Sequence, residues 1–89
     1  MSDIERVKKA LKRVKLPNWI ESTTAEAMVD HTGEPAVRVT FVVRVGREDE
    51  VKDGAALSEL ARKVHSAIIA AGVLDLYPYT RFVGASEAA

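Results

Sequence analysis

The chain has 89 residues, 47 % of them apolar, and its 13 Lys or Arg balance its 13 Asp or Glu. A length below about 100 residues fits one domain and excludes a two-domain enzyme with an interdomain cleft. The lack of cysteine excludes disulfides, thiolate nucleophiles and sulfur-ligated metals. Nearly every large apolar side chain is needed for one core, so we expect no sizeable internal pocket.

The zero net charge hides an uneven distribution. Residues 1–16 carry six Lys or Arg and two acids, so the rest of the chain carries seven and eleven. This asymmetry is a mild indication of an N-terminal segment that faces anions. No stretch approaches the roughly 18 apolar residues that span a bilayer, and residues 1–9 are unlike a signal peptide. We expect a cytoplasmic protein that does not enter membranes.

The first predicted element is an amphipathic helix from Ser2 to Leu16. Apolar residues recur at spacings of three and four on one stripe, and they are Ile4, Val7, Leu11 and Val14. Pro17 cannot continue the helical hydrogen bonds, so the helix is expected to end before it. The opposite face is basic, and its candidates for contact with an anion are Lys8, Lys9, Lys12 and Arg13.

Two strands are predicted next, over residues 21–30 and 36–45. In the first strand every second side chain is expected to face the core, and these side chains are small: Thr23, Ala25, Ala27 and Val29. The second alternates with a strongly apolar set, Val37, Val39, Phe41, Val43 and Val45. Between them Asp30 to Pro35 supply turn residues, which indicates a hairpin with a loop of four to six residues.

A second helix and a third strand complete the pattern. An apolar stripe runs from Leu57 to Ala71, with Asp53 as the expected cap and Gly72 as the left-handed residue at the end. The third strand covers about residues 76–83, and Pro78 places it at a sheet edge or in a bulge. Residues 85–89 are expected to fray.

The order of helix, strand, strand, helix and strand predicts an α+β two-layer sandwich. Both helices have one apolar stripe, so we expect them to cover the same face of a three-stranded sheet and to leave the other face open. Residues 1–84 then form one domain, followed by the tail 85–89.

The open face carries the candidate residues for binding a partner. Side chains alternate across a strand, which sends one set away from the helices: Arg38, Thr40, Val42, Arg44, Tyr77, Tyr79 and Arg81. Tyr and Arg are enriched at protein interfaces, and the same two residue types stack on unpaired bases.

The sequence offers few residues in an arrangement typical of a catalytic site. His31 lies beside Asp30 and Glu34 on one turn, where a solvated role explains it better than metal binding. His65 falls at the margin of the second helix's stripe, as a partly buried structural residue does. We therefore predict no enzyme activity, metal, cofactor or small-molecule substrate.

Two resemblances follow from these features. The element order is similar to that of type II KH domains and ribosome-binding factor A, and Ala70-Ala71-Gly72 resembles the Ala-x-Gly kink of the latter. A typical KH domain also carries a Gly-x-x-Gly loop that clamps the RNA backbone, and this chain has none, so the resemblance does not extend to that loop. The segments Asp30 to Ala36 and Tyr79 to Phe82 resemble those of small bacterial proteins with no established activity. This second resemblance implies the same α+β fold and a bacterial cytoplasmic origin.

Two functional hypotheses remain. The first is a non-enzymatic module that binds a protein partner, or forms a homodimer, through its open sheet face or its valine-rich strand acting as an exposed edge. The alternative is an RNA-binding module that uses the basic N-terminal helix together with the Tyr and Arg platform.

Overall fold

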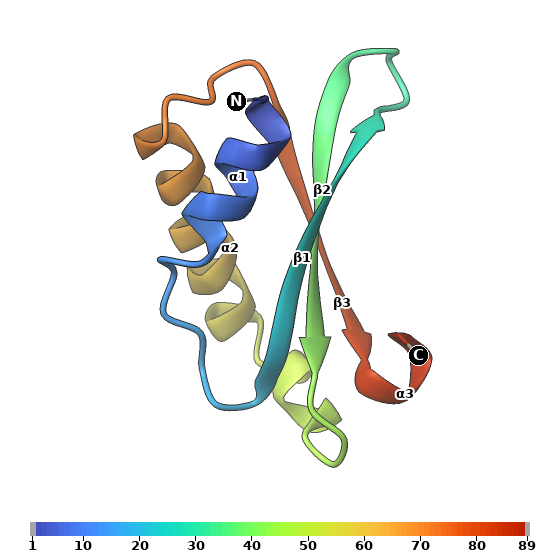
Figure 1. Ribbon diagram of the computed structural model, residues 1–89. Helices are drawn as coiled ribbons and strands as arrows, with labels where there is room; N and C mark the ends of the chain where they lie inside the picture. Colours follow the sequence, from blue (N-terminus) through green and yellow to red (C-terminus); the bar gives the residue numbers. More distant parts are fainter. Residues whose placement is uncertain (1, 89) are drawn as a thin grey trace.

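The computed structural model describes residues 2–88 as a three-stranded sheet with two helices on one face (Figure 1). The elements are α1 (Asp3–Leu11), β1 (Ile20–Val29), β2 (Pro35–Val43), the 3-10 helix η1 (Glu48–Lys52), α2 (Gly54–Ala70), β3 (Tyr77–Gly84) and the short helix α3 (Ala85–Ala88). The predicted two-layer α+β architecture and the order of its main elements are confirmed.

The sheet has the spatial order β1-β2-β3. β1 pairs with β2 in the antiparallel sense and β3 pairs with β2 in the parallel sense, so α2 is the crossover between two parallel strands. The valine-rich strand β2 therefore lies in the middle. Its expected role as an exposed edge is wrong, because the hairpin fills one side of it and the crossover brings β3 to the other. β1 and β3 are the two edges.

The core lies between this sheet and the helices. β2 points four almost fully buried side chains at the helix layer: Val37, Val39, Phe41 and Val43. α1 and α2 pack their apolar stripes on them, with Val7, Leu11, Leu60, Val64 and Ile68 buried. The Phe41 ring stacks on Phe82 of β3 with centroids 5.0 Å apart, and buried Trp19 also stacks on Phe82, with centroids 6.4 Å apart. Trp19 thus closes one end of the core, as a lone tryptophan after the first helix suggests.

α1 is shorter than its apolar periodicity predicts. It ends at Leu11 rather than Leu16, and the chain then tightens, since the N–H of Val14 bonds to the carbonyl of Leu11 three residues earlier. Val14 and Leu16 still pack against the core, although they do so from an irregular segment. Because Val14 and Leu16 are buried without being helical, the apolar pattern continues beyond the end of α1.

α2 follows its sequence signals closely. The Asp53 side chain accepts hydrogen bonds from the N–H groups of Ala55 and Ala56, which confirms it as the cap. At the other end Gly72 has φ +84°, and the N–H of Val73 bonds back to the carbonyl of Ile68. This is the left-handed helix ending that Gly72 predicts.

The strands of the hairpin differ from expectation at their far ends. β2 ends at Val43, and Val45 is 72 % exposed beyond it, so its place in the inward set is wrong. Ala27 and Val29 of β1 are exposed as well, Val29 at 66 %. The reason is visible in Figure 1, where the turn between β1 and β2 extends beyond the layer of α1 and α2.

The hydrogen bonds at the two ends of the hairpin fix the direction of its backbone groups. Asp30 N–H bonds to Glu34 O beside the turn, and at the other end, beyond the register shift between Ile20 and Ser22, Arg44 N–H bonds to Trp19 O, so the even-numbered residues of β2 face β1 at both ends. Hydrogen-bonded pairs alternate with non-bonded pairs along an antiparallel ladder. With Thr24 opposite Thr40 in the same register, the even-numbered residues of β1 point their N–H and C=O groups at β2. A set of odd-numbered residues points them away from the sheet: Thr23, Ala25, Ala27 and Val29.

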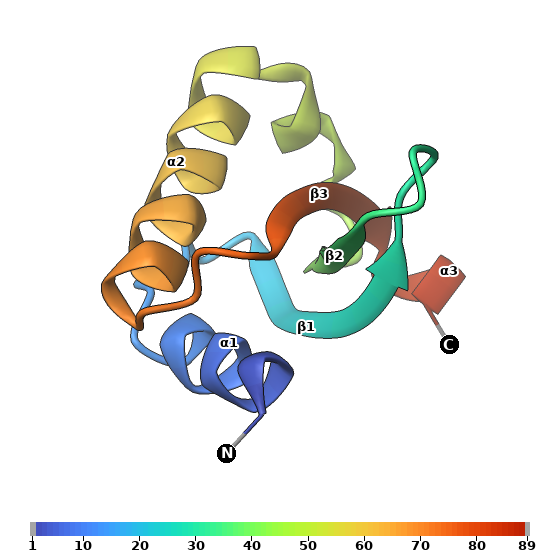
Figure 2. The same cartoon turned by 90° about the horizontal axis from the view of Figure 1, so that it is seen from above.

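Within the tail 85–89, predicted to fray, Ala85–Ala88 form a short helix, and residue 89 lies outside the described residues. Viewed from above, α1 and α2 lie on one side of the strands and α3 on the other (Figure 2). No helix within residues 2–88 has the length and apolar character needed to cross a bilayer.

Candidate functional site

The open face is built as the sequence predicts, with one set of side chains per strand. The parallel register sets Tyr79 opposite Arg38 and Arg81 opposite Thr40, so these side chains share the face turned away from α1 and α2. Val42 shares this face with Arg38 and Thr40 on β2, whereas Tyr77, at the start of β3, lies at the sheet edge and contacts His65 of α2. Arg44 does not belong to this set, because it lies after the end of β2 and its Nε donates to the carbonyl of Asn18 at 2.7 Å.

The middle of this face is not available to a partner. Thr40 is 5 % exposed and lies beneath Arg81, and Val42 is 7 % exposed near the end of β2 that α3 contacts. Their orientation is as expected, but this burial counts against their predicted role as contact residues. A binding surface here would consist of the covering side chains alone.

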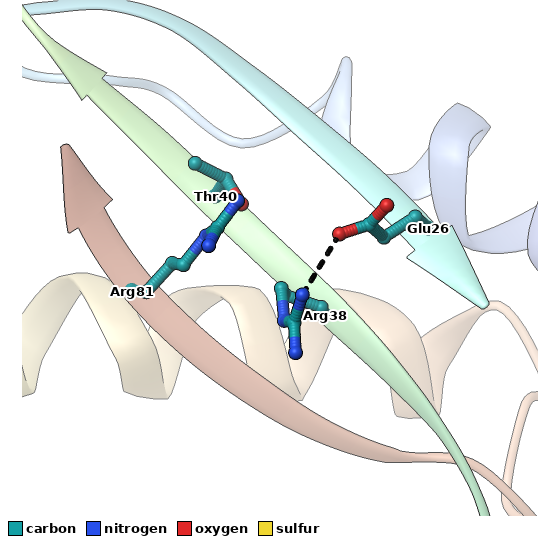
Figure 3. A network of polar contacts seen from close by, with 4 residues as sticks. All are labelled: Glu26, Arg38, Thr40 and Arg81. Atoms are coloured by element: carbon teal, nitrogen blue, oxygen red, sulfur yellow. Dashed lines mark hydrogen bonds and ion pairs between the residues drawn. The ribbon is translucent and has the colours of Figure 1, made fainter. Parts of the chain in front are cut away.

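The side chains over this face make two separate polar contacts (Figure 3). Arg38 pairs with Glu26 of β1 at 3.3 Å, and Arg81 Nε donates to the hydroxyl of Thr40 at 2.9 Å. The first pair neutralises Arg38, and the second fixes Arg81 on a neutral partner. Ion pairs this exposed are worth about 0–1 kcal/mol, so the network covers the sheet more than it stabilises it.

The two tyrosines lie at the other end of the sheet, beside the hairpin turn. Their rings are 4.9 Å apart, and the Tyr79 hydroxyl donates to Oδ2 of Asp30 at 3.3 Å. Tyr77 is 59 % exposed and meets the exposed His65 of α2 edge-on at 6.0 Å. His65 therefore does not have the partly buried position expected of it.

Asp30 organises the turn by charge and hydrogen bonding. Its Oδ1 accepts from the Thr32 hydroxyl at 2.6 Å and from the N–H groups of Thr32 and Glu34. The hydroxyl of Thr32, followed by the Glu34 N–H, lowers the pKa of Asp30 to about 2. Desolvation first, and then the charge of Asp30, raises the pKa of Tyr79. Gly33, with φ +86°, completes the turn.

This arrangement gives Asp30 a structural role. Within the described residues, no group of three or more His, Cys, Asp or Glu side chains is placed to hold a metal ion. The exposed His31 has no hydrogen-bond partner among its neighbours in the structure described. The turn therefore links the hairpin to β3 through the hydrogen bond between Asp30 and Tyr79.

The basic residues predicted to contact an anion are exposed, and they lie on two flanks of the α1 region. Lys8 and Lys12 face β1, whereas Lys9 and Arg13 face the end of α2 around Ala67 and Ala71. α1 belongs to the helix layer on one side of the strands (Figure 2), whereas Arg38 and Arg81 project from the opposite face of the sheet, and the tyrosines lie at the β3 edge, where Tyr77 contacts His65 of α2. The two halves of the RNA-binding hypothesis thus do not form one surface.

Sequence reasoning missed the surface along the edge of β1. β1 has ten residues, and the odd-numbered ones direct their backbone N–H and C=O groups away from β2. Edge strands are normally blunted by Pro, by Lys or by being short. β3 has Pro78 and eight residues, whereas β1 contains neither Pro nor Lys and is irregular only at its start, between Ile20 and Ser22.

A groove of about 470 Å³ runs beside this edge. Its walls come from α1, the irregular segment after it and the middle of β1, and the lining residues are Lys8, Leu11, Lys12, Val14, Leu16, Thr23, Thr24 and Ala25. The floor is apolar and the rim carries two lysines. A local sequence pattern holds no signal for this groove, because it depends on where α1 ends and on which strand is the edge.

One hydrogen-bonding group in the groove is unsatisfied. Among the described residues, a single buried side-chain oxygen or nitrogen lacks a partner, and it is the Oγ1 of Thr23. A buried polar atom without a partner costs free energy and calls for an explanation such as a missing water or ligand. Its position coincides with the exposed edge and the apolar groove.

Comparisons with protein-family models, with curated protein sequences and with solved structures gave no significant match. The functional argument therefore rests on the geometry of this chain.

Proposed function

We propose that this protein is a non-enzymatic binding module that accepts an extended segment of another protein as a fourth strand on β1. The observation that carries this proposal is the ten-residue edge with its unpaired backbone groups. In strand addition, main-chain hydrogen bonds supply affinity, and pockets for alternate side chains supply specificity. β1 has both the free backbone and an adjacent groove.

The edge of β1 is favoured over the open face because its backbone groups are unpaired, whereas the polar side chains of the open face are already bonded. On the open face Arg38 and Arg81 already bond within the molecule, and the central residues beneath them are buried. Along β1 the groups of Thr23, Ala25 and Ala27 that would bind a strand have no partner within the sheet. A new strand there replaces water and breaks no existing contact.

The RNA-binding alternative has less support. Its lysines lie on α1, whereas its arginines project from the opposite face of the sheet, and the hydroxyl of Tyr79 is bonded to the ionised Asp30. A carboxylate beside the stacking rings repels the phosphates that would accompany a base.

The test is to select peptides from a random library against the protein and to locate their binding by amide NMR. We expect the largest shifts at Thr23, Ala25 and Ala27, and loss of binding in Ala27→Pro, since proline removes an outward N–H that the new strand needs. Arg81→Ala, on the open face, is the matched control and should bind normally. Selected peptides that shift Arg38, Tyr79 and Arg81 instead would refute the proposal in favour of the open face.

A further inference from the structure

The groove next to β1 also carries information about the segment that binds there. Thr23 and Ala25 line it, and both belong to the set whose backbone points outward. The side chains of a strand added to this edge alternate between the two faces of the sheet. Every second side chain of the incoming segment would therefore lie over the groove.

The floor of the groove calls for a bulky apolar side chain. Leu11, Val14 and Leu16 form it, and all three belong to or pack against the hydrophobic core. A volume of about 470 Å³ lies within the range of roughly 300–1,000 Å³ common for ligand pockets. Filling it with a leucine-sized or larger group removes apolar surface of both partners from water.

The rim calls for negative charge. Lys8 and Lys12 are exposed, one helical turn apart, and neither takes part in an ion pair within the described part of the chain. Carboxylates placed two residues before and after the apolar group would lie on the same face of the added strand and reach this rim.

A second copy of this chain fits poorly as the occupant. Two β1 strands paired about a two-fold axis normal to the sheet would place both α1 helices on the same side, with their Lys8 and Lys12 facing each other. The groove-facing side chains of that second β1 would be Thr23, Ala25 and Ala27, which are too small to fill the groove.

Resting on the proposed strand addition, we infer that the partner segment is an acidic extended peptide of another protein, with one bulky apolar side chain that enters the groove between Leu11, Leu16 and β1. Thr23, whose Oγ1 is buried without a hydrogen-bond partner, is one of the residues that line this groove.

Three synthetic β-strand peptides test this inference by NMR titration. The first has a central Leu with Glu two residues to either side, the second has Ala in place of Leu, and the third has Lys in place of both Glu. We expect all binding to map to the amides of Thr23, Ala25 and Ala27. The second peptide should bind about tenfold or more weakly than the first. At low salt the third peptide should also bind about tenfold or more weakly than the first.

Charge reversal on the protein provides the complementary test. The double variant Lys8→Glu with Lys12→Glu should bind the acidic peptide about tenfold more weakly than the wild type does, and it should bind the basic peptide more tightly. Lys9→Glu with Arg13→Glu makes the same charge change on the other flank of α1 and should leave the order of the peptides unchanged. Circular dichroism establishes that both variants fold.

These experiments distinguish strand addition at β1 from the chemistry of the partner segment. Equal affinities of the three peptides at β1 would overturn the inference about partner chemistry and leave strand addition in place. No shift at the β1 amides with any peptide would overturn the proposed function as well. A dimer in light scattering that disappears in Ala27→Pro would show that the occupant is a second copy, against the inference.

Discussion

The hydroxyl of Tyr79 on β3 donates a hydrogen bond to Asp30 in the turn of the β1–β2 hairpin, 3.3 Å away and 49 residues earlier in the chain. This contact joins the edge strand to the turn across the end of the sheet. It also couples two ionisable groups, because the charge of Asp30 raises the pKa of Tyr79, while their hydrogen bond lowers that of Asp30. The tyrosine that the sequence marks as a partner contact thus has a structural role.

The ranking of the causes at Asp30 yields a first prediction. The hydroxyl of Thr32 is the largest cause of the lowered pKa and Tyr79 the smallest, so Thr32→Val should raise the pKa of Asp30 from about 2 towards 3.8 more than Tyr79→Phe does. Carboxyl ¹³C NMR titration of Asp30 in the three proteins measures this. A larger rise in Tyr79→Phe would contradict the assignment.

The same shift has a consequence for stability against pH. A carboxyl whose folded pKa lies below its unfolded value stabilises the fold above the unfolded pKa, and this stability is lost as the pH falls through the folded value. For Asp30 the window lies between about pH 4 and pH 2. Urea denaturation across this window should show a smaller loss of stability in Thr32→Val than in the wild type.

The aromatic stack gives a second prediction. Phe41 is fully buried on the central strand, whereas Phe82, which stacks on it, is partly buried on the edge strand. Phe41→Ala should cost about 3–5 kcal/mol of unfolding free energy, the range for large core aromatics, and Phe82→Ala clearly less. Urea denaturation with an unchanged m-value measures both. Equal costs would mean that the edge strand is as firmly packed as the centre.

These residues show what a sequence pattern can and cannot predict. The burial of Phe41 and the parity of Tyr79 and Arg81 follow from strict alternation, which a half-buried strand imposes over its whole length. The cap at Asp53 follows from local chemistry. In each case a single element determines the outcome.

The wrong predictions concern features that depend on several elements at once. Val14 continues the apolar spacing of α1 and Pro17 is the first residue that must end a helix, so these two signals placed the end of α1 too late, because Val14 and Leu16 pack on the core from an irregular segment. Val45 continues the alternation of β2 beyond the point where any neighbour covers it. The edge of β1 depends on the order of the strands, which no single segment encodes. The candidate site was therefore the part of the molecule least accessible from the sequence.

The cap of α2 gives a third prediction. Asp53 satisfies two N–H groups at the first turn, so Asp53→Ala should cost about 1 kcal/mol. Glu59→Ala is a suitable control on the same helix, because Glu59 makes only an exposed pair with Lys63 at 3.6 Å. The control should cost no more than about 0.5 kcal/mol, and thermal unfolding of the two variants compares them directly. A cap variant as stable as the control would rule out this role for Asp53.

The alternation along β1 gives the last prediction, and it needs no partner molecule. The N–H groups of Glu26 and Met28 bond to β2, whereas those of Ala25, Ala27 and Val29 point to the free edge. Amide hydrogen exchange should therefore alternate, fast at odd positions and slow at even ones, because only the bonded groups require local opening. The central strand β2 is paired on both sides and should be protected at odd and even positions alike. Uniform protection along β1 would mean that another chain already covers this edge, and light scattering on the same sample would then show whether that chain is a second copy.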